Sequence, residues 1–202
     1  MRWLGVDRAR GRWAWVLLDA DGVVGGGVVG ALAELPAAGV VAIDIPLVFP
    51  DEGGRRRCEV EGRRMLGDRR STMFETFPRW VYAGRSYDDA LRDECRRRLG
   101  RAPSAHSHAL GRSILEAVAV AGPGWIETHP ELAFRRITGT VVPPKTRPDG
   151  VRVRLAALGV APPPIRAGTD DVLDACVCAI VARDHAAGTA RFVGDPGDAI
   201  WY

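Results

Sequence analysis

The first thirty residues alternate apolar runs with short turn signals. Apolar residues dominate positions 2–7, 12–18 and 23–29, with Gly11 in the first gap and Asp21-Gly22 in the second. Runs of this length, separated by turn residues, predict β-strands. Gaps this short connect strands that run in opposite directions. The pattern therefore predicts three consecutive antiparallel strands.

The rest of the chain alternates predicted helices with single strands. A short helix over 31–35 leads into a buried strand, 40–43, that ends at Asp44, and a further strand, 125–129, stops at Pro130. Helical patterns with glycine stops or polar starts cover 59–66, 87–99, 106–121, 131–137, 151–158 and 170–188, the last with Thr169 as its expected N-cap, and two short segments, 191–193 and 199–202, close the chain.

Three antiparallel strands followed by strands separated by helices define a fold class. We predict an α/β protein with a mixed five-stranded sheet, three antiparallel strands then parallel ones, flanked by helices. This is the strand order of the RNase H-like fold. Residues 1–202 are expected to form one such domain, with a largely helical insertion at about 50–124.

Composition narrows the class of protein. The 202 residues are 47% hydrophobic and 26% charged, near the average of globular proteins, and no apolar run approaches the ~20 residues of a membrane span. The N-terminal segment is a strand that carries an acid, unlike a signal peptide. Cys58, Cys95, Cys176 and Cys178 have no zinc-site spacing and are interpreted as reduced thiols. We expect a soluble, cytoplasmic protein that does not associate with membranes.

The positive charge is almost entirely arginine. Net charge is only +3, Lys145 is the sole lysine, and arginine crowds into 55–57, 63–64, 69–70 and 96–98. The planar guanidinium suits phosphate recognition, so Arg63 and Arg64 are candidates for contact with nucleic acid. The alternative is a set of solvated helix faces in an arginine-biased sequence.

Four aspartates stand where a metal site could form. Asp7 ends the first strand, Asp44 follows the fourth, and Asp171 and Asp174 lie three residues apart at the start of the last long helix. Each has an ordinary explanation, as a turn residue or as an acid at a helix N-terminus. Asp174, however, leads a strongly apolar stretch, where an unpaired charge is costly.

A second group of polar residues follows the strand at 125–129. Glu127 and His129 alternate along it and share one face, and Glu131 comes just after. His129 is either a structural histidine or, beside carboxylates, a metal ligand or proton shuttle.

With these residues identified, the chain resembles the domain of unknown function 429 family, whose members are described as predicted nucleases of RNase H-like fold. Glu127-Thr128-His129-Pro130-Glu131 and Asp170-Asp171-x-x-Asp174-Ala175 carry the resemblance most strongly. Gly5-Val6-Asp7, Ile43-Asp44-Ile45-Pro46, Pro78-Arg79 and Lys145-Thr146 support it. The chain departs from the family pattern at His106 and Ser113, where the family tends to carry glutamine and lysine. The closing helix is also similar to that of Holliday-junction resolvases.

Together these features predict a nuclease that depends on Mg²⁺ or Mn²⁺. Asp7, Asp44, Asp171 and Asp174 would bind metal, and Glu127 or His129 would orient or deprotonate the attacking water. Lys145, Arg79, Arg63 and Arg64 would bind the phosphates of DNA or RNA. Two other interpretations stay open: a nucleotide-binding or phosphotransfer protein of the same superfamily, and a non-catalytic binding module.

Overall fold

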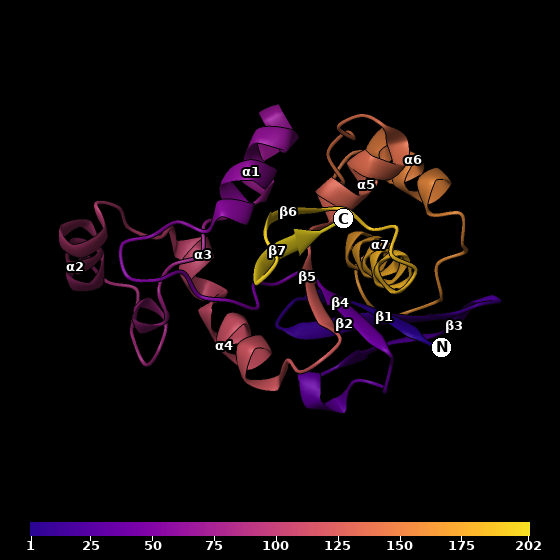
Figure 1. Ribbon diagram of the computed structural model, residues 1–202, viewed down its shortest axis with the longest axis horizontal. Coiled ribbons are helices and arrows are strands. Elements are labelled where there is room, and N and C mark those ends of the chain that lie inside the picture. Colours follow the sequence, from indigo (N-terminus) through magenta and orange to yellow (C-terminus); the bar gives the residue numbers. More distant parts are fainter.

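The computed structural model describes residues 1–202 and has a seven-stranded mixed sheet at its centre (Figure 1). The strand order is β3-β2-β1-β4-β5-β7-β6. Strands β1, β2 and β3 are antiparallel, β1, β4, β5 and β7 are parallel, and β6 runs antiparallel to β7. The strands are β1 (Trp3–Ala9), β2 (Arg12–Asp19), β3 (Gly22–Val29), β4 (Val40–Ile43), β5 (Trp125–Thr128), β6 (Phe192–Asp195) and β7 (Asp198–Trp201).

The fold class predicted from the sequence is confirmed. The first five strands have the RNase H-like order, with an antiparallel three-stranded part and a parallel continuation. The sheet is wider than expected because the last two short segments pair with each other as a hairpin. Strand β7 of that hairpin also pairs with β5, where Glu127 lies opposite Ile200.

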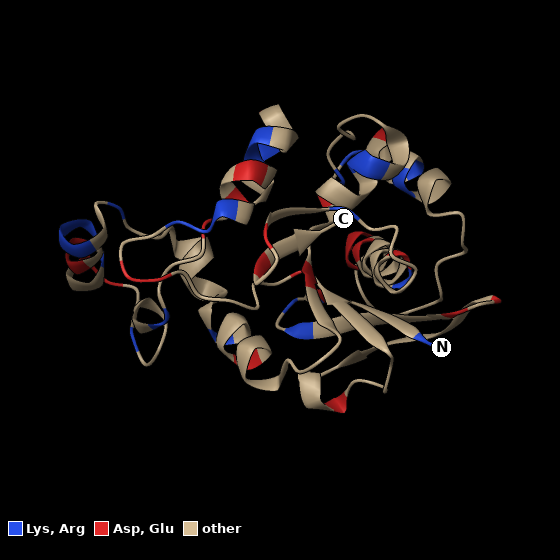
Figure 2. Ribbon diagram, in the orientation of Figure 1, with Lys and Arg blue, Asp and Glu red and all other residues tan.

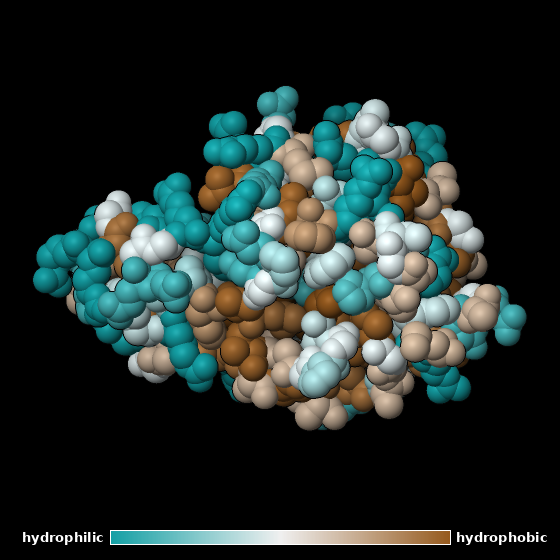
Figure 3. Space-filling view, viewed as in Figure 1, coloured by the Kyte–Doolittle hydropathy of each residue, from teal (hydrophilic) through white to brown (hydrophobic).

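Helices cover both faces of the sheet and extend beyond it (Figure 1). The insertion between β4 and β5 holds α1 to α4 and projects away from the sheet, with α2 at its far end. The helices are α1 (Arg57–Leu66), α2 (Asp89–Leu99), α3 (Ala105–Ala109), α4 (Gly111–Val120), α5 (Pro130–Thr138), α6 (Pro148–Leu158) and α7 (Thr169–Ala186), with 3₁₀ turns at Leu32–Glu34, Gly67–Thr72 and Arg79–Val81. Figure 3 shows hydrophilic residues over the projecting part and apolar surface gathered near α4. No helix is both long and apolar enough to span a membrane.

Several element boundaries differ from the sequence prediction by one to three residues, and two further differences concern how helices begin or are divided. The expected helix over 106–121 is split at Leu110 into α3 and α4, and the Tyr82 ring packs against Gly111, the first residue of α4. A Cβ atom on Gly111 would lie 2.3 Å from Tyr82 Cδ1. Thr169 is the first residue of α7 rather than its N-cap; Gly168 takes that position and makes no side-chain cap bond.

Strand alternation divides the interior into two cores, one on each face of the sheet. Ala42 faces the core that contains the buried segment of α7, including Cys176 and Cys178. Leu4 and Val6 face the opposite core, built with residues of the insertion. Because successive side chains point to opposite faces, Gly5 and Asp7 lie on the α7 side of β1, and Asp44 continues the α7 side of β4.

Helix α7 crosses β1 at very short range. A Cβ atom on Gly5 would lie 2.1 Å from both the Ala175 carbonyl oxygen and the Ala179 amide nitrogen. Only a residue without a side chain permits this approach, because any Cβ there would overlap the helix backbone.

We predict that Gly5→Ala lowers the free energy of unfolding by about 3 kcal/mol or more, since overpacking against rigid backbone forces β1 and α7 apart. Urea unfolding followed by circular dichroism measures the loss. The control is Gly122→Ala, at an exposed position where nothing lies within 4 Å of the added Cβ. That variant should stay within ~0.5 kcal/mol of the wild type. Equal stabilities of the two variants would show that the β1–α7 contact is adaptable.

Candidate functional site

Three aspartates from distant parts of the chain meet at one end of the parallel strands. In the β1–β4 pair, Val6 lies opposite Ile43, and the Asp44 amide donates to the Val6 carbonyl over 3.0 Å. Asp7 and Asp44 are therefore neighbours beyond this last register pair. Asp174, in the second turn of α7, is the main charge acting on both of them. We call Asp7, Asp44 and Asp174 the carboxylate cluster.

Crowding of negative charge with little solvent raises the pKa of every member of the carboxylate cluster. Burial is the main cause at each. The pKa of Asp7 is well above its usual range, with Asp174 and Asp44 adding to the effect of burial. Burial and Asp174 raise the pKa of Asp44 to about 8, and burial raises that of Asp174 to about 6 despite a neighbouring lysine. The nearby positive charge is therefore too small to offset the burial of these three carboxylates.

The sole lysine supplies the only cation in direct contact with the carboxylate cluster. Lys145 Nζ lies 2.5 Å from Asp174 Oδ2 and 3.8 Å from Asp170 Oδ2. Asp174, Asp7 and Asp44 all raise the pKa of Lys145, so its ammonium stays charged. No ion pair within 4.0 Å reaches Asp7 or Asp44, and one ammonium therefore faces three carboxylates.

Asp171 lies at the rim of the site rather than within the carboxylate cluster. It is partly exposed and lies about one helical turn before Asp174, in the N-terminal turn of α7. Its pKa is raised by burial and by Asp170, while Lys145 and Arg10 lower it. Of the two acids expected from the last helix, the structure thus brings Asp174 into the cluster and leaves Asp171 beside it.

The donor chemistry of the carboxylate cluster fits a hard divalent cation, because carboxylate oxygens are the ligands that Mg²⁺ and Mn²⁺ prefer. Asp7 is buried and Asp44 is partly buried, and neither has a cationic partner within 4.0 Å. As the side chains stand, however, no three His, Cys, Asp or Glu residues are arranged to hold a metal ion. Metal binding would therefore require these side chains to rotate.

His129 lies beside a small cavity next to the carboxylate cluster. Asp44, Glu127 and His129 are among the residues that line this space of about 20 Å³, roughly the room for one water molecule. Burial lowers the pKa of His129 to about 4, so its ring is neutral at pH 7. Its Nε2 lies 3.4 Å from the Thr72 carbonyl, which can only accept, and its buried Nδ1 has no partner. The ring therefore presents a free lone pair at Nδ1.

Glu127 is held in a closed ion pair. The fully buried Arg56 guanidinium donates to Glu127 Oε1 over 2.9 Å and to Oε2 over 2.6 Å, and the Leu47 amide donates to Oε2 over 3.0 Å. Arg56 also pairs with Glu59 and Asp198. Strand alternation puts Ile126 on the α7 side of β5 and Glu127 on the other side. Because both of its oxygens are occupied, Glu127 acts as an anchor. His129 is the residue whose ring nitrogen Nδ1 can still accept a proton.

Glu131 is fixed in the same manner. Arg154, completely buried, donates to both Glu131 oxygens over 2.8 Å and also to the Pro143 and Gly150 carbonyls. Arg69 adds a contact of 2.9 Å to the same carboxylate. Sequence reasoning assigned neither Arg56 nor Arg154 a role at this site. Arg56 is hidden within an arginine run, and the pattern of polar and apolar positions does not mark Arg154 as buried.

The predicted phosphate-binding arginines make their contacts elsewhere. Arg63 donates to the Met73 carbonyl over 3.0 Å, and the Arg79 guanidinium lies 5.8 Å from the centre of the Phe49 ring. Arg64 is exposed, and no ion pair joins any of these arginines to the carboxylate cluster. His106 is also exposed, while Ser113 is buried and accepts from Arg8 Nε over 2.7 Å. Of the predicted phosphate ligands, only Lys145 contacts the cluster.

An RNase H-like sheet with acids at the ends of β1 and β4 and on the last long helix defines the class of this protein. The chain belongs to the DUF429 family of proteins of unknown function, whose family model matches residues 5–198. A solved structure of RuvC from Thermus thermophilus is similar over 100% of both chains, with a TM-score of 0.41 and 14% sequence identity. No curated protein sequence matches the chain.

The raised carboxylate pKa values predict that the metal-free protein loses stability as the pH rises from 6.5 to 8. Burial raises the pKa of Asp44 to about 8 and that of Glu59 to about 7. The folded protein therefore still holds protons on these two residues in this pH range, whereas the unfolded chain has already released them. Below pH 6.5, His129 acts in the opposite direction, because its folded pKa is lowered.

Urea unfolding in EDTA across this pH range measures the effect. The expected slope is on the order of 1 kcal/mol per pH unit for each such proton. Asp44→Asn removes one of these protons and should reduce the slope, leaving the contributions of Glu59 and Asp7. Stability that stays level or increases with pH would show that the carboxylate cluster is not strained in the metal-free protein.

Proposed function

We propose that this protein is a divalent-metal-dependent hydrolase of phosphodiester bonds in DNA or RNA. The observation that carries the proposal is the carboxylate cluster: three acids from β1, β4 and α7 with one ammonium between them, beside a neutral histidine. Burial and mutual repulsion raise the pKa values of these acids in the metal-free protein, and a divalent cation that replaces their protons would relieve both.

In this proposal, Asp7, Asp44 and Asp174 hold Mg²⁺ or Mn²⁺, and Asp171 at the rim is the fourth carboxylate. When bound, the ion would supply Lewis-acid stabilisation of the phosphate and an acidified water. His129 would accept a proton at Nδ1 from water in the adjacent cavity, since Nε2 is committed to the Thr72 carbonyl. Lys145, once released from Asp174, would pair with an anionic phosphate oxygen.

Glu127 supports this arrangement without taking part in proton transfer. Its two oxygens are occupied by Arg56 and the Leu47 amide, so it holds the end of β5, from which His129 projects. Positioning by a rigid buried pair keeps the imidazole in place while the neighbouring carboxylates bind or release cations.

The first test is cleavage of labelled single-stranded, duplex, hybrid and branched nucleic acids with Mg²⁺ or Mn²⁺ and with EDTA. Asp7→Asn should lower the metal-dependent rate on the order of 10²–10³-fold, because it removes a ligand of the cation that would stabilise the anionic transition state. Asp93→Asn, at an exposed residue of α2, is the matched control and should retain the wild-type rate.

Calorimetric titration of Mg²⁺ into the wild type separates the alternatives. Metal binding without cleavage of any substrate would favour a nucleotide-binding protein or a binding module. Absence of both would show that the acids are structural.

Lys145 provides a second test, since its ammonium and the metal ion compete for the same carboxylates. Lys145→Met should bind Mg²⁺ more tightly, by about tenfold or more, because no protein cation then opposes the ion. The variant should also destabilise the metal-free protein by on the order of 1–2 kcal/mol, allowing for the partly exposed ammonium.

Cleavage by Lys145→Met should fall despite the tighter binding, as the phosphate loses its counter-charge. Lys145→Arg serves as the control, because it keeps the charge and should not tighten metal binding. A methionine variant with unchanged metal affinity would contradict the competition.

A further inference from the structure

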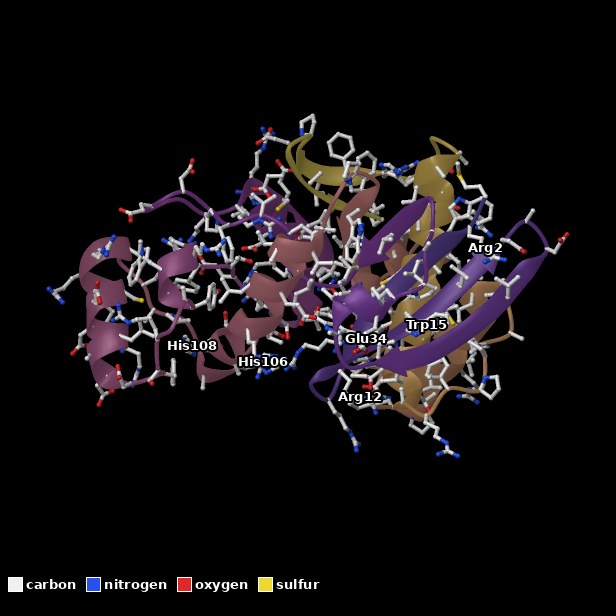
Figure 4. All side chains as sticks on the ribbon, turned by 90° about the horizontal axis from the view of Figure 1, so that it is seen from below. Arg2, Arg12, Trp15, Glu34, His106 and His108 are labelled. Carbon is white, nitrogen blue, oxygen red and sulfur yellow. The ribbon has the colours of Figure 1, made fainter.

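A groove lined by three arginines includes Asp171 among its lining residues. It has a volume of about 370 Å³ and runs between the β1–β2 turn and the segment that precedes α7. Arg10 and Arg12 line it from the hairpin, Arg166 and Gly168 line it from the segment before α7, and Asp171 lines it from the first turn of α7. Figure 4 shows Arg12 at the edge of the molecule, near the end of its strand.

The three arginines of this groove have no acidic partners. Arg10, Arg12 and Arg166 are exposed, and none forms an ion pair within 4.0 Å. The arginine-rich insertion differs, because many of its guanidinium groups are neutralised internally; Figure 2 shows blue and red residues interleaved on α1 and α2. Arg57, for example, pairs with Glu61 and Asp195. The groove therefore offers positive charge that the fold does not use.

The backbone holds Arg10 in a conformation that arginine rarely adopts. Arg10 and Gly11 form a two-residue turn between the paired residues Ala9 and Arg12, with φ of 50° and 83°. Turns of this kind favour asparagine, aspartate or glycine at the first position. Arg10 is the only non-glycine residue of the chain with positive φ. A long cationic side chain at such a position is unfavourable for the turn itself, which points to a role beyond the turn.

The groove leads toward the carboxylate cluster. Asp171 lines the groove and lies three residues before Asp174 on α7, and the charges of both Arg10 and Lys145 lower its pKa. Arg10 follows Asp7 by three residues of nearly extended chain, ~10 Å. That span corresponds to about three base steps at ~3.4 Å of axis per strand.

We propose that Arg10, Arg12 and Arg166 bind the phosphodiester backbone of a nucleic-acid strand as it approaches the carboxylate cluster. The inference rests on the proposed function and adds the path of the substrate. Three guanidinium groups against one carboxylate leave the groove positive, and exposed arginine forks match phosphate oxygens. This path differs from the one expected from the sequence, through Arg63 and Arg64.

The test is binding of labelled 20-nucleotide DNA and RNA single strands and a DNA duplex, followed by fluorescence anisotropy in EDTA over a series of salt concentrations. The variant combines Arg10→Gly, Arg12→Gln and Arg166→Gln. Loss of three contacts should reduce the slope of log K against log salt by about 2 for a single strand and weaken binding on the order of tenfold. Glycine suits the turn, so Arg10→Gly alone should retain or raise the melting temperature while weakening binding.

The control variant removes the same charge elsewhere, through Arg97→Gln, Arg152→Gln and Arg191→Gln, three exposed arginines without ion pairs. It should keep the wild-type slope. Equal losses in both variants would show a general charge effect and overturn the proposal, as would unchanged binding by the groove variant or no binding by the wild type. Because EDTA prevents metal-dependent cleavage, a failed groove leaves the hydrolase proposal standing, and a failed hydrolase proposal leaves the binding result interpretable.

Discussion

The contact between β1 and α7 at Gly5 is the constraint on which the rest of the site depends. The two backbones approach so closely that a single methyl group would overlap both Ala175 and Ala179. Strand alternation then places Asp7, two residues later, on the same side, and Asp174 belongs to the adjacent turn of the helix. Backbone packing thus brings Asp7 and Asp174 together. The free energy gained by burying the large apolar core around α7 offsets the repulsion between the two carboxylates.

Two fully buried arginines give the site its rigid wall. Arg56 holds Glu127 in a bidentate pair, and Arg154 donates from Nη2 to both oxygens of Glu131, so the acids on both sides of His129 are fixed. Buried pairs of this geometry are costly to break, since either partner alone would be an uncompensated charge. The histidine between them is consequently held with one nitrogen committed and the other free, while the carboxylate cluster, with a single ammonium, keeps the capacity to exchange its counter-charge.

Residues whose placement follows from local periodicity could be predicted from the sequence. Apolar runs that end in Asp7 and Asp44 located the point where β1 and β4 stop pairing, although β1 itself continues beside β2 to Ala9. The arginine network could not be predicted, because whether Arg56 or Arg154 is buried depends on how the insertion and α6 pack, which periodicity does not encode. The same limit explains why Asp171 and Asp174 were treated alike, although one turn of helix separates a rim position from a buried one.

Arginine and lysine pair with different kinds of carboxylate in this chain. Where a carboxylate is an anchor, the partner is arginine, whose planar fork occupies both oxygens, as in the Arg56–Glu127 pair. The carboxylate cluster instead contacts the sole lysine, a compact point charge on a flexible stem that reaches one oxygen of Asp174. A divalent ion that displaces Lys145 would break a single hydrogen bond to Asp174, whereas displacing Arg56 from Glu127 would break two. The position of the only lysine therefore supports a site whose cation changes during function rather than one whose acids are purely structural.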